Sequence, residues 1–267
     1  LMHGIEVDYY KKLFQTAGNI IELIEKDDIP KYLLFLENVF PYMDNYNYQK
    51  GMKEIIQELK NFLKPKDIGT DSDRALLLDF QATLETKPEK AIKLEKDALA
   101  QIENITADNA RLVSNLHANL GGLYRMNGHP DLAREHMEKS ISLLDQFNLL
   151  HINDSIPQIA NYAMFLTEQQ EPERGISELQ KLSGIIKEYH SDDCLDYAKV
   201  QETLGTIYLM TANLPQAKTH FKRAFKIYEK IWADEPEMIE AKYQEIQELY
   251  PQIGFCIGKN LSGLLTK

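Results

Sequence analysis

Residues 112–147 read LVSNLHANLGGLYRMNGHPDLAREHMEKSISLLDQF. In the first half of this stretch, Leu116, Leu120 and Leu123 follow the three-and-four spacing that places side chains on one face of an α-helix. An Asn-Gly dipeptide then marks a turn. Pro130 stands where a second helix begins, because its fixed φ suits a first helical turn. The stretch therefore predicts two short helices joined by a tight turn.

The same pattern returns with a period of 42 residues. A small residue of the first helix recurs at Gly121, Ala163 and Gly205. The second helix repeats a small residue and, one turn later, a large apolar one: the small residues are Ala91, Ala133, Gly175 and Ala217, and the large ones are Met137, Leu179 and Phe221. A fixed period of this length is typical of a stacked array of helix pairs. We therefore expect an all-α fold, a right-handed α-α superhelix.

The first unit follows the pattern least well, because Asp79 replaces the small residue and Glu95 the large apolar one. The predicted boundaries are listed here: N-terminal helices at 1–64, acting as a cap or a diverged repeat; a connector at 65–71; repeat units near 72–113, 114–155, 156–197 and 198–236; a capping helix at 237–250; and a tail at 251–267 that is a short helix or disordered.

Three details of the first 72 residues are also predicted. A helix is expected at 5–26, and Pro41 is expected to end or kink the helix at 29–43, since proline removes a helical hydrogen bond. Asp71 or Ser72 is expected to cap the first helix of the array.

The repeat resembles the tetratricopeptide repeat family. The residues that carry the resemblance are those of the last unit: Leu204-Gly205, Tyr208, Ala217, Phe221 and Ala224. The usual repeat has 34 residues. The longer period found here is similar to kinesin-light-chain-type repeats, which are also common in bacterial signalling proteins. Over roughly residues 71–250, the resemblance implies this fold and a role in binding other proteins.

Composition limits the classes of partner. The chain has 267 residues, a net charge of −11 and a pI near 5.2, a balance that disfavours nucleic acid and anionic lipid as partners.

The sequence shows no apolar run of membrane-spanning length and no secretory signal, so we expect a cytoplasmic protein that does not bind membranes. Cys194 and Cys256 form no CxxC pair and are expected to be reduced. Because the sequence begins at a leucine, we expect a fragment of a longer chain, and the composition and repeat type suit a bacterial protein.

Catalytic motifs are missing from the sequence. The segment 254–259 has only three residues between its glycines and follows no predicted strand, so it is not a phosphate-binding loop. None of the seven histidines forms an HExxH motif or a His/Cys cluster. His136 and His220 share one repeat column that is expected to face solvent. We therefore expect no enzyme activity, no metal and no cofactor.

Binding is the expected activity, since the first helix of each pair lines the concave face of such an array. The candidate partner-binding residues are Asn115, Asn119, Gly122, Arg125, Met126, Asn161, Met164, Lys199, Thr203 and Thr206. Asn119, Asn161 and Thr203 share one column. In related peptide-binding repeats, asparagines in this column hold a peptide backbone, so the resemblance implies that role here. The two cations suit a carboxylate of the ligand, and Met126, Met164 and Met210 suit an adaptable apolar floor.

The sequence leaves three functions open. The first is a protein-interaction module that takes an extended peptide or helix, from a partner or from its own chain. The second is a sensor of a signalling peptide that passes a change of superhelix to an effector domain. The third is a set of repeats that regulates an upstream nucleotide-hydrolysing domain. In each case the partner is a protein or peptide, and the oligomeric state is left open.

Overall fold

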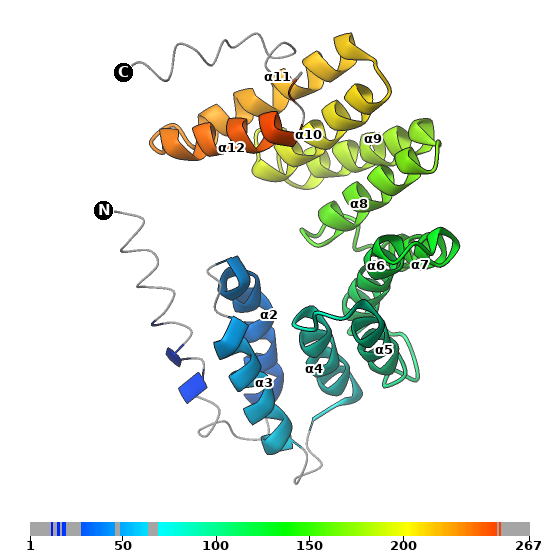
Figure 1. Cartoon of the computed structure of the whole chain (residues 1–267), viewed down its shortest axis with the longest axis vertical. Helices are drawn as coiled ribbons and strands as arrows, with labels where there is room; N and C mark the ends of the chain where they lie inside the picture. Colours follow the sequence, from blue (N-terminus) through cyan, green and yellow to red (C-terminus); the bar gives the residue numbers. More distant parts are fainter. Residues whose placement is uncertain are drawn as a thin grey trace. The chain divides into compact units, whose positions relative to one another are not determined.

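The computed structural model describes residues 28–45, 49–63, 69–249 and 251, together with residues 12, 15, 16, 18 and 19. This described part consists of α-helices and their connections and contains no β-strand (Figure 1). It divides into two compact units, with the boundary between Ser140 and Ile141. The predicted all-α fold of repeated helix pairs is confirmed.

The first unit contains α2 (Ile29–Asn45), α3 (Gln49–Leu63), α4 (Asp71–Thr83), α5 (Pro88–Leu99), α6 (Ala110–Met126) and the first part of α7 (Pro130–Gln146). Its largest apolar cluster joins α2 and α3 to α4. The buried residues at this junction include Leu36 of α2, Met52 and Leu59 of α3, and Leu77 and Phe80 of α4. The N-terminal helix pair therefore shares a core with the first helix of the repeat array.

The second unit contains the rest of α7 and α8 (Ser155–Glu168), α9 (Pro172–Tyr189), α10 (Leu195–Met210), α11 (Leu214–Ile231) and α12 (Pro236–Leu249). One continuous apolar cluster runs through α8 to α12. Tyr243 and Ile246 of α12 are buried in it, and Ile239 packs against it.

The repeat columns mark the places where the two helices of a pair approach each other. A Cβ added to Gly121 would lie 2.6 Å from Cγ of Met137, and one added to Gly205 would lie 3.0 Å from the ring of Phe221. Such separations are shorter than van der Waals contact, so the large residue of the second helix fills the space that glycine leaves.

The N-terminal region differs from one prediction. Helix α2 continues from Ile29 to Asn45, so of the two outcomes expected of Pro41, an end or a kink, the first does not occur. Only four residues follow this proline in the helix. The proline removes one hydrogen bond of the helix, and the helix continues for about one more turn. The helix predicted at 5–26 and the tail predicted at 251–267 lie outside the described residues, apart from the few residues named above.

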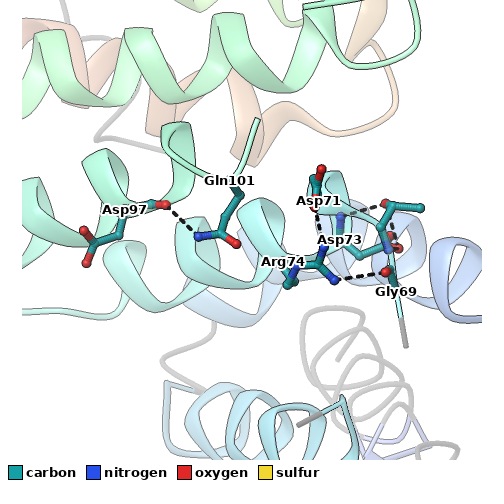
Figure 2. Close-up of polar contacts among 7 residues, drawn as sticks. Gly69, Asp71, Asp73, Arg74, Asp97 and Gln101 are labelled. Carbon is teal, nitrogen blue, oxygen red and sulfur yellow. Dashed lines mark hydrogen bonds and ion pairs between the residues drawn. The ribbon is translucent and has the colours of Figure 1, made fainter. Parts of the chain in front are cut away.

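Helix α4 begins with a capping box made by Thr70. The hydroxyl of Thr70 accepts a hydrogen bond from the backbone N–H of Asp73 (3.2 Å), and Oδ2 of Asp73 accepts one from the N–H of Thr70 (2.6 Å). Arg74 adds an ion pair to Asp71 and a 3.0 Å hydrogen bond to the carbonyl of Gly69 (Figure 2). The expectation that Asp71 or Ser72 is the cap is therefore wrong, because the helix starts one residue earlier than predicted.

We expect Thr70→Ala to destabilise the first unit by about 1 kcal/mol. The substitution removes the acceptor for the N–H of Asp73, a residue that is itself buried. Urea unfolding followed by circular dichroism measures the change. Thr70→Ser is the control, since it keeps the hydroxyl and should keep most of the stability. Equal stability of Thr70→Ala and the wild type would contradict this role of the cap.

Within the described residues, no helix is both long enough and apolar enough to span a bilayer.

Candidate peptide-binding face

The ten candidate residues lie on the first helices of three successive repeats, α6, α8 and α10. Their exposure divides them into three groups. Asn119, Met126, Asn161 and Lys199 are exposed; Asn115, Gly122, Arg125, Met164 and Thr203 are half-buried; and Thr206 is buried. Since α6 belongs to the first unit and α8 and α10 to the second, each part of this face is described separately.

On α6, the surface around Gly122 is open. A Cβ added to Gly122 would meet no atom within 4 Å, in contrast to the crowded site at the neighbouring Gly121. One turn further along, the Met126 side chain is 83% exposed. An apolar side chain with this exposure, next to unfilled space, suits contact with another molecule.

Asn119 is exposed but already engaged by its own unit. Its side-chain Nδ2 donates a 2.8 Å hydrogen bond to Oδ1 of Asp79 on α4. The asparagine amide is therefore held in one orientation before any ligand is present. Sequence reasoning treated Asn119 as equivalent to Asn161, and the structure shows that their surroundings differ.

On α8 and α10, the candidate residues offer less hydrogen bonding than their sequence suggests. Asn161 is exposed on α8, and Met164 packs partly into the core. The hydroxyl of Thr203 donates to the carbonyl of Lys199 in its own helix (3.0 Å). Thr206 is only 9% exposed and has little surface to present to a ligand. Asn161 is thus the amide of this unit that best fits the predicted role.

Glu202, near the middle of α10, is bonded to residues of α11 and α12. Lys242 of α12 forms a 3.1 Å ion pair with Glu202, and the hydroxyl of Tyr228 donates a 2.6 Å hydrogen bond to the same carboxylate. The Lys242 side chain is largely buried in this arrangement. Glu202 therefore stabilises the last helix of the array.

A carboxyl pair that sequence reasoning did not connect lies between α4 and α5. Glu95 is buried and Asp79 is half-buried, and the two carboxyl groups lie close enough to shift each other's pKa. Burial, followed by the nearby Asp79 carboxylate, raises the pKa of Glu95 far above its usual range. Burial also raises the pKa of Asp79. The signal was present in the sequence as two breaks of the repeat pattern, and the spacing of 42 residues had already put them at facing positions.

The histidines of the repeat column differ from the prediction. His136 and His220 are half-buried, because His136 stacks on Tyr124 and His220 on Tyr208, with ring centroids 5.4 and 5.2 Å apart. The expectation that this column faces solvent is therefore wrong. Each histidine also pairs with the preceding helix: Nδ1 of His136 lies 2.9 Å from Nδ1 of His117, and Nδ1 of His220 lies 2.9 Å from Oε1 of Gln201.

These histidine contacts are structural in character. Burial, with nearby His136 and Lys139, lowers the pKa of His117 to about 4. Burial lowers the pKa of His136 and of His220 as well. At neutral pH the rings are therefore neutral, which suits stacking on tyrosine. Within the described part of the chain, no group of three or more His, Cys, Asp or Glu side chains could hold a metal ion.

Comparison with known proteins gives a consistent result. Residues 155–230, which span α8 to α11, match the family model described as "Tetratricopeptide repeat". Among the curated proteins, none matches this chain in sequence.

Solved structures resemble the fold at low sequence identity. BtubC (BKLC) from P. vanneervenii is similar with a TM-score of 0.55 and 19% identity, over 68% of this chain and 72% of that one. The "putative kinesin light chain nearly identical TPR-like repeats" of Podosopora anserina are similar with a TM-score of 0.56 and 13% identity, over 73% of this chain and 96% of that one. A glutamine-to-methionine variant of the latter gives a TM-score of 0.58 at 13% identity, over 76% and 98% of the two chains.

The helix pairs, their interlocking small and large residues and these similarities define a helical-repeat protein. More specifically, residues 155–230 match the tetratricopeptide repeat family, and the fold resembles solved repeats of the kinesin light chain type. Repeats of this family generally mediate protein–protein interaction, and the fold is typically a non-catalytic scaffold.

Proposed function

We propose that this protein is a peptide-binding module that takes an extended segment of a protein partner on the first-helix face of its repeats, without catalysing a reaction. The observation that supports this most is the surface of α6, where open space over Gly122 adjoins the exposed Met126 side chain. On α8, the exposed amide of Asn161 lies one turn before the thioether of Met164. Both units therefore present an asparagine amide and a methionine on a first helix, Asn119 with Met126 and Asn161 with Met164.

The chemistry of these side chains favours a peptide. An asparagine amide both donates to and accepts from a backbone, and methionine adapts to apolar side chains of different shape. The likeness to kinesin-light-chain-type repeats supports, as part of the same proposal, a scaffold role in a cytosolic signalling or regulatory protein. The peptide can come from a partner or from another segment of the same polypeptide, because both offer the same backbone and side-chain groups to this face.

The proposal predicts that two substitutions on the first-helix face weaken peptide binding. Peptides selected from a random display library against the whole chain serve as ligands, and their affinity is measured by fluorescence anisotropy. Asn161→Ala removes an exposed amide in the second unit and should weaken binding about fivefold, the effect of about one hydrogen bond. Gly122→Gln should block contact in the first unit, since the new side chain would extend into the open space.

The matched control is Gln180→Ala, which removes an exposed amide from α9, the second helix of the pair that contains Asn161. This variant should bind as the wild type does. Circular dichroism establishes that all three variants are folded. If the selected peptides bind Asn161→Ala and Gly122→Gln as tightly as Gln180→Ala, the proposed face is not the binding site.

A further inference from the structure

Helix α11 carries a row of cationic side chains on its exposed face, although the chain as a whole is acidic. Four lysines follow one another at intervals of four residues, and one arginine lies beside them: Lys218, Lys222, Lys226, Lys230 and Arg223. Residues four apart form one ridge along the surface of a helix. The opposite face of α11 is buried in the apolar cluster of the second unit. We call these five cations the lysine row.

The repeat fold does not require the lysine row. One period earlier, the positions of the four lysines are occupied in α9 by Ile176, Gln180, Gly184 and Glu188. Two periods earlier, they are occupied in α7 by Arg134, Glu138, Ser142 and Gln146. Both helices are second helices of a pair, as α11 is. A second helix of this array therefore packs with a mixed outer face, and the concentration of lysine is a property of α11 rather than of the repeat.

The lysine row is unfavourable for α11 on its own. Like charges four residues apart repel each other, and cations in the first half of a helix also oppose its dipole. Among the described residues, no ion-pair partner offsets this for Lys218, Lys222, Arg223 or Lys226. The one carboxylate within α11, Glu229, accepts a 3.3 Å hydrogen bond from the hydroxyl of Tyr243. Such an uncompensated concentration of charge suits an anionic partner.

One carboxylate of the protein already binds to the end of the lysine row. Lys230 forms an ion pair with Asp193, in the loop that precedes α10. The hydrogen bond and charge of Lys230, with a smaller contribution from Lys226, lower the pKa of the Asp193 carboxyl. The row thus stabilises a carboxylate where the chain supplies one, and the positions before Lys230 remain open to carboxylates of another molecule.

Exposed apolar side chains lie at both ends of the lysine row. Leu214 comes four residues before Lys218, and Ile231 directly follows Lys230. Their side chains are 42% and 41% exposed. At the rise of an α-helix, the surface from Leu214 to Ile231 is about 26 Å long. This length matches about five turns of a partner helix.

An acidic helix fits this surface better than a membrane or a nucleic acid does. The apolar face of α11 is buried, so it is not available for insertion between lipids. Helix α12 shares the apolar cluster with α11 (Figure 1) and carries exposed Glu237, Glu245 and Glu248. These carboxylates and the net charge of −11 repel a broad polyanion such as a bilayer or a duplex. A single helix, about 10 Å across, can follow the row without covering its surroundings.

We propose that the lysine row of α11 is a second interaction surface, which binds an acidic α-helix of a protein partner. Carboxylates at every fourth residue of the partner pair with the lysines, and apolar side chains at its ends contact Leu214 and Ile231. Ridges of this kind on two helices align when the helices cross at about −50°. The surface lies on a second helix of a pair, so the proposal goes beyond the peptide-binding function proposed for the first-helix face and does not depend on it.

Two capped synthetic peptides of identical composition test the proposal. The first carries glutamate at every fourth residue, leucine at both ends and alanine elsewhere. In the second, the same number of glutamates stand five residues apart, which distributes them around the helix. NMR titration of the ¹⁵N-labelled whole chain at low ionic strength measures the affinity and locates the contact. We expect the first peptide to bind about fivefold more tightly than the second and to shift the amide signals of α11.

A double substitution in the lysine row completes the test. Lys222→Gln/Lys226→Gln should weaken binding of the first peptide about fivefold, the effect of about two exposed ion pairs. The matched control is Lys90→Gln/Lys93→Gln, which removes the same charge from exposed positions of α5 and should bind as the wild type does. Circular dichroism establishes that both variants fold.

Equal binding of the two peptides, or equal weakening by the two double substitutions, would overturn the proposal. Vesicles of phosphatidylserine and phosphatidylcholine and a short DNA duplex are titrated in parallel. If either binds more tightly than the first peptide and loses this binding in Lys222→Gln/Lys226→Gln, the row binds lipid or nucleic acid and the choice of a protein helix is wrong. Gly122→Gln and Asn161→Ala test the first-helix face separately, so failure of one surface does not decide the other.

Discussion

Gly175→Ala should destabilise the second unit by about 3 kcal/mol, an effect typical of overpacking against a rigid neighbour. A Cβ at position 175 would lie 2.6 Å from the carbonyl oxygen of Ala163 and 3.2 Å from its carbonyl carbon. These are backbone atoms of α8, so no side-chain rotation can relieve the contact. Helices α8 and α9 would have to separate, which would disturb the shared apolar cluster around Leu179.

The same helix offers a matched control. Gly184 of α9 is exposed, and a Cβ there would meet no atom within 4 Å. Gly184→Ala should therefore be neutral or stabilise the protein by up to about 1 kcal/mol, since alanine has the higher helix propensity. Urea unfolding of both variants, followed by circular dichroism, compares them. Equal stability of the two would show that α8 and α9 do not approach each other as closely as described.

The carboxyl pair should make the stability of the first unit fall as the pH rises. Because the folded-state pKa of Glu95 is raised above its usual 4.5, the folded protein keeps a proton that the unfolded chain releases. The stabilisation is therefore complete below the unfolded pKa and is lost as the pH increases toward the folded pKa. One full proton corresponds to about 1.4 kcal/mol per pH unit.

Glu95→Gln isolates this contribution. Glutamine keeps the shape and a donor for Asp79 but does not titrate, so the variant should be more stable than the wild type by about 2 kcal/mol at about pH 8. The measurement compares free energies of unfolding between about pH 7 and about pH 9, above the range in which histidines titrate.

Two other groups bear on this comparison. Two histidines of the first unit, His117 and His136, have lowered pKa values and would make the stability rise with pH at acidic pH, the opposite sign. The exposed Glu89→Gln serves as the control and should follow the wild type. If Glu95→Gln shows the same pH dependence as Glu89→Gln, the pair does not hold a proton in the folded protein.

The sequence predicts most of the fold because the residue sizes at its repeat positions indicate where the two helices of a pair are in contact. Gly121 opposite Met137 and Gly205 opposite Phe221 are side chains whose sizes match only if the two helices of a pair touch at that point. The burial of Tyr243 and Ile246 follows from the same periodicity. Patterns of this kind depend on one helix or one helix pair, so the spacing of residues along the sequence is sufficient to predict which side chains are buried.

Contacts that depend on polar partners were predicted less well. Asn119 and Asn161 occupy one column, yet only Asn119 faces an aspartate, because Asp79 breaks the pattern of the preceding helix. Spacing places a residue on a face of a helix but does not give the rotamer or the hydrogen-bond partner. The cap at Thr70 was missed for a related reason, since several neighbouring residues can cap a helix and the chain uses one of them.

The candidate site is supported by the exposure and hydrogen bonding of individual side chains. The exposed Met126 and Asn161 fit a binding face, whereas Thr206 is nearly covered and Thr203 is bonded within its helix. The amides and methionines therefore carry the proposal, and the threonines add little to it.

Methyl NMR of the methionines tests the central claim most directly. In protein labelled at the methionine methyl groups, a peptide selected as described above is titrated into the sample. Met126, Met164 and Met210 lie on first helices of the repeats, while Met52 is buried in the core and Met238 is exposed on α12. If the first-helix face binds the peptide, the signal of Met126 in the first unit or those of Met164 and Met210 in the second should shift, and those of Met52 and Met238 should stay. Shifts confined to Met238, or no shift at a concentration that saturates binding, would contradict the account.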